Sequence, residues 1–340
     1  MTLAYGVFRP AGGGPRVGAR RDEGIVDLSE LDDVFRACTL NAFMARGRDF
    51  WRKTHERVRA LDAPAIDPAD VELLLPFSVA DYVDFYSSLE HATNLGRILR
   101  PGQEPLLPNW RHLPIGYHGR AGTVVVSGTP IRRPSGQLKA GEFAPTRRLD
   151  VELELGFVVG VPSLLGEPVP IERALEHVFG LLLVNDWSAR DIQAWEYQPL
   201  GPFLGKSFAT SISAWVVPLD ELADRRVELP PQEPPPLSYL AADPWAYDLE
   251  LEIELNGESI SRTNARHLYW SIEQQVAHLT VNGAALRTGD LLASGTISGS
   301  EPDARGSLIE LFDNTRFLAD GDEVVLRAPS ISLEVSGRIV

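Results

Sequence analysis

Short segments in which apolar and polar residues alternate dominate most of this chain, and they constrain its fold more than any other feature. This alternation, which is typical of β-strands, occurs at residues 123–126, 151–159, 181–184, 249–255, 324–326 and 333–335. Helical spacing occurs in four stretches of the same region, at residues 87–99, 171–178, 188–197 and 271–279. The strands and helices do not alternate one by one, which argues against a doubly wound parallel sheet and favours a strand-rich α+β fold.

The first 70 residues differ from the rest of the chain. They contain strand-like segments at 3–8 and 24–28, and one amphipathic helix is expected at 40–61. Residues 62–70 hold two prolines and few core residues, which is typical of a linker. We therefore predict two domains, a small β domain at 1–70 and a larger domain at 71–340.

The charge and the cysteine content exclude several kinds of partner and location. Asp and Glu number 47 against 32 Lys and Arg, and the resulting net charge of −15 argues against nucleic acid or an anionic membrane as a partner. The single cysteine, Cys38, cannot form an intrachain disulfide, as is usual in the cytosol. Residues 1–10 lack the features of a signal peptide, and no apolar run reaches the ~18–20 residues that span a bilayer. We expect a soluble cytoplasmic protein.

Two of the predicted strands carry a carboxylate at every second position. Glu152 and Glu154 share one face, where converging oxygens suit a hard divalent cation. Residues 249–255 show the same alternation, so a strand that presents acid to water is the alternative for both. The first strand continues into an apolar run at 156–160, which predicts burial on both faces, and buried carboxylates need a partner. The second meets the hairpin turn Asn256-Gly257 and is predicted to be a surface ribbon.

A polar cluster follows the third predicted strand. Asp186 lies on the turn at the strand end, and Ser188 is expected to cap the next helix. Arg190, Gln193 and Tyr197 are spaced by three and four residues, so they share one helical face. Such a face suits the binding of an oxyanion or carboxylate, and a solvated polar surface is the alternative.

Lys206 and His91 are further candidates. Only three lysines occur among the 32 basic residues. Lys206 stands between glycine and serine in the run at 201–207, which indicates a position where a compact point charge is required. That run is not a phosphate-binding loop, because three residues rather than four separate its glycines. The absence of G-x-S-x-G and G-x-G-x-x-G argues against a serine hydrolase and a nucleotide enzyme. His91 lies near the acidic Asp84, and a structural histidine is the alternative to a catalytic one.

Several long strings resemble the fumarylacetoacetate hydrolase family. They are EHATN at 90–94, LPIGYHGRA at 113–121, NDWSARDIQ at 185–193, PLGPFLGKSF at 199–208 and ASGTISG at 293–299. The resemblance extends from residue 75 to residue 325. It implies a small SH3-like β-barrel at the N-terminus, a mixed β-sandwich roll that carries the active site, and a homodimer.

The resemblance also implies roles for individual residues. It implies that a Ca²⁺ or Mg²⁺ ion is held by four carboxylates, those of Asp84, Glu152, Glu154 and Asp186. A second cation position would involve Lys206 and Thr210, next to Ala209 where the family usually has glycine. Substrate contacts would come from Tyr86, Arg100, Gln193, Tyr197 and Thr296. The pair that activates water would be His91 with Glu310, and the group that stabilises an oxyanion would be Arg190, Gln193 and Lys206.

The activity implied by the resemblance is hydrolysis of the C–C bond of 4-fumarylacetoacetate to fumarate and acetoacetate, the last step of tyrosine breakdown. An acylpyruvate or fumarylpyruvate hydrolase with the same site is the nearest alternative. A hydratase or decarboxylase of 2-oxo acids and a metal-binding protein without activity are further alternatives.

Overall fold

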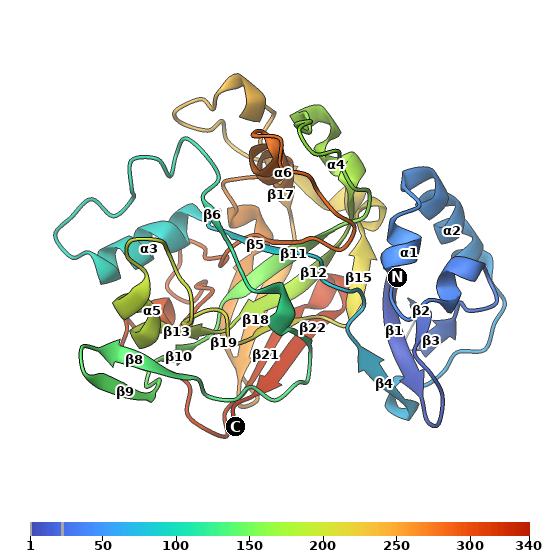
Figure 1. Ribbon diagram of the computed structural model, residues 1–340, viewed down its shortest axis with the longest axis horizontal. Coiled ribbons are helices and arrows are strands. Elements are labelled where there is room, and N and C mark those ends of the chain that lie inside the picture. The colour runs from blue at the N-terminus through green and yellow to red at the C-terminus, as the bar shows by residue number, and fades with distance from the viewer. Residues whose placement is uncertain (1, 22–23) are drawn as a thin grey trace.

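The computed structural model describes residues 2–21 and 24–340, and a large mixed β-sheet forms its centre (Figure 1). Its strands lie side by side in the order β3 (Gly24–Asp27), β2 (Arg16–Arg21), β1 (Ala4–Pro10), β15 (Trp215–Pro218), β12 (Val178–Asp186), β11 (Leu153–Val159), β20 (Leu291–Ala293), β5 (Tyr82–Phe85) and β6 (Gly116–His118). β4 (Val71–Leu74) pairs with β1, and β14 (Thr210–Ile212) pairs with β12 and β7 (Val124–Val126). β20 runs parallel to β5, and β14 runs parallel to β7. The mixed, strand-rich sheet confirms the predicted α+β class.

The two central strands are buried along their whole length. Every residue of β11 and β12 is shielded from solvent. Leu181 and Leu183 of β12 pack on one side of the sheet, whereas Leu182 and Val184 pack on the other, because successive side chains of a strand point to opposite faces. The prediction of a strand that is buried on both faces is confirmed for β11.

A second sheet packs against the first and completes a sandwich. Its order is β19 (Glu258–Asn264), β18 (Glu250–Leu255), β21 (Glu323–Ala328) and β22 (Leu333–Arg338). Leu251 and Ile253 of β18 share the core with Leu183, while the glutamates between them stay partly exposed. Asn256 and Gly257 have φ values of 53° and 83°, as a two-residue hairpin turn requires. The predicted hairpin turn and the strand that presents its glutamates towards water are therefore confirmed, although β18 is an inner strand of a four-stranded sheet and not an isolated surface ribbon.

Smaller elements surround the two sheets. The two-stranded pairs are β8 (Ser135–Lys139) with β9 (Glu142–Pro145), β10 (Leu149–Asp150) with β13 (Ser188–Ala189), and β16 (Arg226–Glu228) with β17 (Trp245–Tyr247). The helices are α1 (Asn41–Met44), α2 (Arg48–Ala60), α3 (Leu89–Leu99), α4 (Ala174–His177), α5 (Arg190–Glu196), α6 (Ile272–Thr280) and α7 (Leu308–Leu311). In Figure 1, α1 and α2 lie at the right end with the first strands, and α3 and α5 lie at the left end.

Two helix predictions are corrected by the structure. The single helix expected at 40–61 is wrong, because Gly47 has a φ of +80°, which no helical residue adopts, and it separates α1 from α2. Ser188 does not cap α5. It belongs to β13, and its hydroxyl donates to the carbonyl of Asp186 at 2.9 Å. α5 consequently begins at Arg190 without a side-chain cap.

The N-terminal strands extend the central sheet. β1 pairs with β15 through Tyr5 opposite Val216 and Gly6 opposite Trp215. A Cβ atom on Gly6 would lie 2.7 Å from the carbonyl oxygen of Ala214, so this close approach requires glycine. The small barrel at 1–70, of which residues 1, 22 and 23 lie outside the described part, stays a prediction. Over residues 2–21 and 24–340, no helix combines the length and the apolar character that crossing a membrane requires.

Candidate active site and metal centre

Three strands of the central sheet bring acidic side chains to one place. β5 carries Asp84, β12 ends at Asp186, and Glu152 immediately precedes β11. β20 joins these strands, since its Ala293 pairs with Asp84 on one side and with Gly156 on the other. One oxygen from each of the three acids lies within 4.8 Å of the other two, and all three residues are buried. This cluster could hold a metal ion.

Oxygens without a hydrogen-bond partner among the described residues, in the cluster on Asp84 and next to the cluster on Glu154, fit a divalent cation. Glu154 is completely buried, and within the described part of the chain neither of its oxygens has a hydrogen-bond partner, nor does Oδ1 of Asp84. Burial and the charge of Asp84 raise the pKa of Glu154, and burial and the charge of Asp186 raise the pKa of Asp84. Unpartnered buried carboxylates are costly, and a hard cation with oxygen ligands satisfies them.

Two buried basic side chains, those of Lys206 and Arg190, bind other oxygens of the cluster. The Nζ atom of Lys206 contacts Glu152 and lies 2.8 Å from Oδ2 of Asp186, while Nη2 of Arg190 lies 2.8 Å from Oε1 of Glu152. Burial raises the pKa of Glu152, but the charges of Lys206 and Arg190 outweigh burial and lower this pKa to about 2. Burial lowers the pKa of Lys206, but the charges of Asp186 and Glu152 outweigh it and raise that pKa, so the ammonium stays charged. Thr210 donates to Oδ1 of Asp186 at 2.8 Å.

Replacing Glu154 by glutamine is expected to separate metal binding from folding. The raised pKa of Glu154 favours the protonated side chain when no cation is bound, so the neutral isostere should leave the stability of the metal-free protein nearly unchanged. Affinity for Ca²⁺ and Mg²⁺, measured by titration calorimetry, should fall by at least about tenfold. The control is Glu252→Gln on β18, whose carboxylate lies 3.4 Å from Arg262. Equal losses of cation affinity in the two variants would contradict the distinction between β11, as the metal-binding strand, and β18.

His91 and Glu310 form a buried pair next to the cluster. Ser88 caps α3 by accepting from the backbone N–H of His91, in the first turn. Nδ1 of His91 lies 2.6 Å from Oε2 of Glu310, which belongs to α7. The oxygens of Glu310 accept further hydrogen bonds from the side chains of Asn94, Ser298 and Ser307. Burial raises the pKa of Glu310, but His91 and the hydrogen bonds from Asn94 and Ser307 outweigh burial and lower the pKa to about 2.

The charge on Glu310 settles the tautomer of His91. An ionised carboxylate can only accept hydrogen bonds, so Nδ1 of His91 donates to Glu310. In the neutral imidazole, Nε2 of His91 then carries the lone pair and can accept a proton. The pair therefore has the arrangement of an oriented general base.

Glu310 is also expected to make stability depend on pH. Its pKa of about 2 lies below the ordinary value of 4.5, so its contribution is present above pH 4.5 and is lost as the pH falls towards 2. Glu310→Gln should therefore be less stable than the native protein at pH 7, by on the order of 3 kcal/mol. In urea unfolding experiments, the difference in the free energy of unfolding between the native protein and Glu310→Gln should narrow below pH 4.5. A difference that stays constant from pH 7 to pH 3.5 would contradict the lowered pKa.

Two of the residues implied in substrate contact, Tyr86 and Gln193, contact His91 and Arg190, and a third, Thr296, is buried. The rings of Tyr86 and His91 meet edge to face at 5.4 Å. Oε1 of Gln193 accepts from Nη1 of Arg190 at 3.2 Å. Thr296 is buried, and its hydroxyl has no hydrogen-bond partner among the described residues.

The other two implied substrate contacts bond within their own segments. Nη2 of Arg100 donates to the carbonyl of Pro105 at 2.7 Å, and the hydroxyl of Tyr197 accepts from Gln198 at 3.0 Å. The roles of Arg100 and Tyr197 in substrate binding stay predictions.

Sequence reasoning missed several polar residues of the site. Oδ2 of Asp150 accepts from Nε of Arg190 at 2.7 Å, and the hydroxyl of Tyr117 donates to Oδ2 of Asp186 at 2.8 Å. Asp150 continues the alternation of Glu152 and Glu154 by one step, so a signal for it existed. Asn94 and Ser298 bond Glu310 from other segments and carry no local signal, whereas Ser307 lies only three residues before Glu310.

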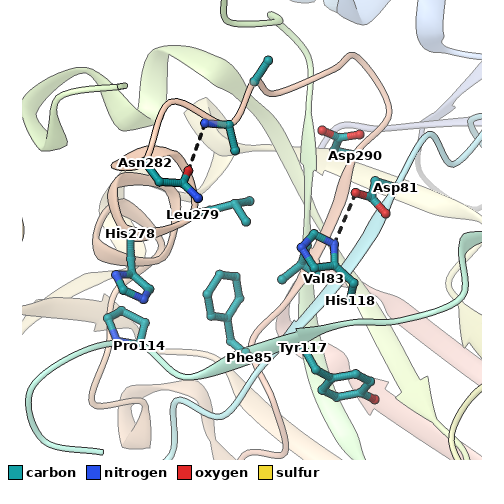
Figure 2. A pocket seen from close by; sticks show the side chains of 13 residues that line it. Asp81, Val83, Phe85, Pro114, Tyr117, His118, His278, Leu279, Asn282 and Asp290 are labelled. Atoms are coloured by element: carbon teal, nitrogen blue, oxygen red, sulfur yellow. Dashed lines mark hydrogen bonds and ion pairs between the residues drawn. The ribbon is translucent and has the colours of Figure 1, made fainter. Parts of the chain in front are cut away.

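A cavity of about 280 Å³ lies on the side of β5 that faces away from the acidic cluster. Figure 2 shows the ring of Phe85 at its centre and His118 beside Asp81, whose atoms are 3.4 Å apart. Val83 also lines the cavity, whereas Asp84 between Val83 and Phe85 does not, because successive side chains of a strand alternate. The cavity therefore lies behind the acidic cluster, and its side chains other than Tyr117, which contacts Asp186, offer controls for the site.

Comparison with known proteins places the chain in a family. Residues 82–336 match the family described as fumarylacetoacetate (FAA) hydrolase C-terminal, and residues 2–72 match fumarylacetoacetase N-terminal. Fumarylacetoacetase of Rattus norvegicus is 46% identical over 96% of this chain and 90% of the relative. Fumarylacetoacetase of Arabidopsis thaliana is 43% identical over 95% of this chain and 89% of the relative.

Solved structures share the fold at lower identity. A fumarylacetoacetate hydrolase from Exiguobacterium antarcticum superimposes with a TM-score of 0.68 at 20% identity and covers 99% of both chains. A maleylpyruvate hydrolase from Sphingobium superimposes with a TM-score of 0.60 at 19% identity, over 100% of this chain and 99% of the other. On the family matches and the nearly full-length identity to its relatives, this chain belongs to the fumarylacetoacetase family.

Proposed function

We propose that this protein hydrolyses 4-fumarylacetoacetate to fumarate and acetoacetate, the last step of tyrosine breakdown. The observation that carries the proposal is the buried pair of His91 and Glu310 beside an acidic cluster that Arg190 and Lys206 hold. Such a site offers a base, donors for an oxyanion and ligands for a cation. The relatives named fumarylacetoacetase support this substrate over other diketo acids.

The first step needs an activated water. Nε2 of His91 accepts a proton from a water molecule while Glu310 holds the opposite side of the ring. A positioned general base of this kind contributes about 10²–10⁴ in rate. The hydroxide adds to the carbonyl carbon next to the fumaryl double bond, so no serine nucleophile is needed.

The second step breaks the C–C bond. Arg190, Gln193 and Lys206 stabilise the oxyanion that forms, and each donor contributes about 3 kcal/mol. Because Oε1 of Gln193 accepts from Arg190, its amide N–H groups remain for the substrate. The oxyanion collapses, the electron pair of the broken bond passes to the acetoacetate carbon, and the proton on His91 neutralises the resulting enolate.

A divalent cation is the proposed cofactor, either Ca²⁺ or Mg²⁺, since the donors are all oxygens. It would be held by the carboxylates of Asp84, Glu152, Glu154 and Asp186, and when bound it acts as a Lewis acid towards the diketone oxygens. Lys206 and Thr210, which both contact Asp186, border the proposed second cation position. The proposed substrate contacts are Tyr86, Arg100, Gln193, Tyr197 and Thr296.

We also propose that the protein is a homodimer located in the cytoplasm. Large apolar side chains gather on α5 and the loop after it, where Leu200 is 96% and Phe203 is 65% exposed. A second copy of the chain would cover them. Light scattering tests the dimer. The single cysteine supports a reducing compartment, and cell fractionation tests it.

The deciding experiment incubates the purified protein with Ca²⁺ or Mg²⁺ and 4-fumarylacetoacetate. The expected result is loss of the diketone absorbance with equal amounts of fumarate and acetoacetate released. Faster turnover of fumarylpyruvate or an acylpyruvate would favour the alternative hydrolase. Consumption of diketone without two acids would favour a hydratase or decarboxylase, and no turnover of any diketo acid would favour a metal-binding protein without activity.

A further inference from the structure

Asp150 is a completely buried carboxylate that contacts two different parts of the site. Its Oδ2 accepts from Nε of Arg190 at 2.7 Å and from the backbone N–H of Ile309 at 3.3 Å. Its Oδ1 accepts from the backbone N–H groups of Val151 and Leu308, both at 2.8 Å. With four hydrogen bonds, the carboxylate of Asp150 is fully used within the protein, so it has no capacity left for substrate or metal.

On one side, Asp150 fixes the direction of the Arg190 guanidinium. Two of its five N–H groups donate hydrogen bonds, that of Nε to Asp150 and one of Nη1 to Gln193. Nη2 forms an ion pair with Glu152 at 2.8 Å but donates no hydrogen bond within the described residues. The three remaining N–H groups, one on Nη1 and two on Nη2, belong to the terminal nitrogens and are available to an oxyanion. Because the hydrogen bond to Asp150 and the ion pair with Glu152 hold the planar group on two sides, the protein sets the direction of those donors.

On the other side, Asp150 holds the beginning of α7. This helix has only four residues, Leu308–Leu311, and Ser307 before it makes no side-chain cap. The Ser307 hydroxyl donates to Glu310 instead, at 2.7 Å. The first two amides of α7, those of Leu308 and Ile309, bond to Asp150. The helix that carries Glu310 is therefore anchored by the carboxylate that orients Arg190.

We propose that Asp150 is a positioning residue that fixes the oxyanion donor Arg190 and the base pair of His91 and Glu310 relative to each other. The strand register supports this role: Asp150 pairs with Ser188, two residues before Arg190, and lies two residues before Glu152. The inference rests on the proposed hydrolase function and deepens it. It assigns no contact with substrate to Asp150.

The test measures the steady-state kinetics of Asp150→Asn on 4-fumarylacetoacetate with saturating Ca²⁺ or Mg²⁺. Asparagine keeps the size but loses the charge and one acceptor, so Arg190 is no longer held on that edge. We expect kcat to fall by about 10- to 100-fold, the effect of removing an outer partner of a site residue, while KM changes little. The matched control is Asp290→Asn. Asp290 is also buried, accepts from the backbone N–H of Arg287 at 2.7 Å, and belongs to the cavity behind β5 (Figure 2). This variant should keep the native kcat.

A double-mutant cycle separates positioning from a general loss of structure. If Asp150 acts through its two neighbours, its replacement should cost less in the Arg190→Lys and Glu310→Gln backgrounds than in the native protein, by at least about threefold. An equal loss of kcat in every background would overturn the inference. Native kcat in Asp150→Asn would overturn it as well, whereas a native protein that does not cleave the substrate would overturn the proposed function instead.

A second variant guards against failure of Asp150→Asn to fold. Asp150→Ser is smaller and keeps a hydroxyl that can accept from one of the α7 amides. We expect the same loss of kcat with a cooperative thermal unfolding transition retained. If both variants lose that transition, Asp150 serves folding alone and the positioning role is overturned.

Discussion

Replacement of His91 by alanine is expected to lower kcat by about 10²- to 10⁴-fold, the range that a positioned general base contributes. The side chain is 3% exposed and its Nδ1 contacts Glu310 rather than the acidic cluster. Its loss should therefore leave the affinity for Ca²⁺ and Mg²⁺ close to native. Stopped assays for fumarate and acetoacetate measure the first effect, and titration calorimetry measures the second.

The control for this prediction is a half-buried histidine outside the site, His278. His278 of α6 shares a hydrogen bond of 3.0 Å with the hydroxyl of Tyr239 and lines the cavity behind β5, away from the acidic cluster. His278→Ala should keep native turnover. If His91→Ala loses cation affinity and turnover to the same extent, His91 has a structural role and the assignment of the base is wrong.

Replacement of Glu152 by glutamine is expected to have the second large effect, a fall in turnover of at least about 10³-fold. Glu152 is a member of the acidic cluster and the shared partner of Arg190 and Lys206. Glutamine at this position removes one charged ligand for the cation. It also removes the charged partner of two donors of the proposed oxyanion site, Arg190 and Lys206. Cation affinity should fall together with kcat, in contrast to the His91 variant.

Glu254→Gln provides the comparison for Glu152. Like Glu152, Glu254 pairs with an arginine, at 3.4 Å from Arg327, but it belongs to the partly exposed face of the strand β18. This variant should keep native turnover and cation binding. If Glu152→Gln keeps native turnover, the acidic cluster has no part in catalysis and the prediction is wrong.

Local patterns predicted much of the fold. The alternation at 151–159 and at 249–255 predicted two strands with different surroundings, and β11 is buried on both faces while β18 is buried on one. The hairpin at Asn256-Gly257 was predictable because a two-residue turn needs residues that adopt a positive φ. The break at Gly47 was not, because the apolar spacing on both sides fits one continuous helix and only the backbone angle reveals two.

The site was predictable in a similar, partial way. The acids and His91 stand out as residue types that need partners when buried, and the family resemblance pointed to Glu310. Tyr117 and Asp150 were missed. Asp150 looked like one more polar residue in an alternating strand, and nothing in its neighbourhood shows that its partners, Arg190 and the amides of α7, come from 40 and 158 residues away.

The amino-acid sequence by itself determined the strand-rich class, the buried and exposed faces of the strands, and the acids that need a counter-charge, because each depends on neighbours in the chain. Only the tertiary structure decided which acids meet. β20 lies between β5 and β11, and this pairing of distant segments brings Asp84 to Glu152 and Asp186. The same packing determines that Lys206 and Arg190 share Glu152. Such contacts depend on how whole strands and helices fit together, and no local pattern of residues encodes that fit.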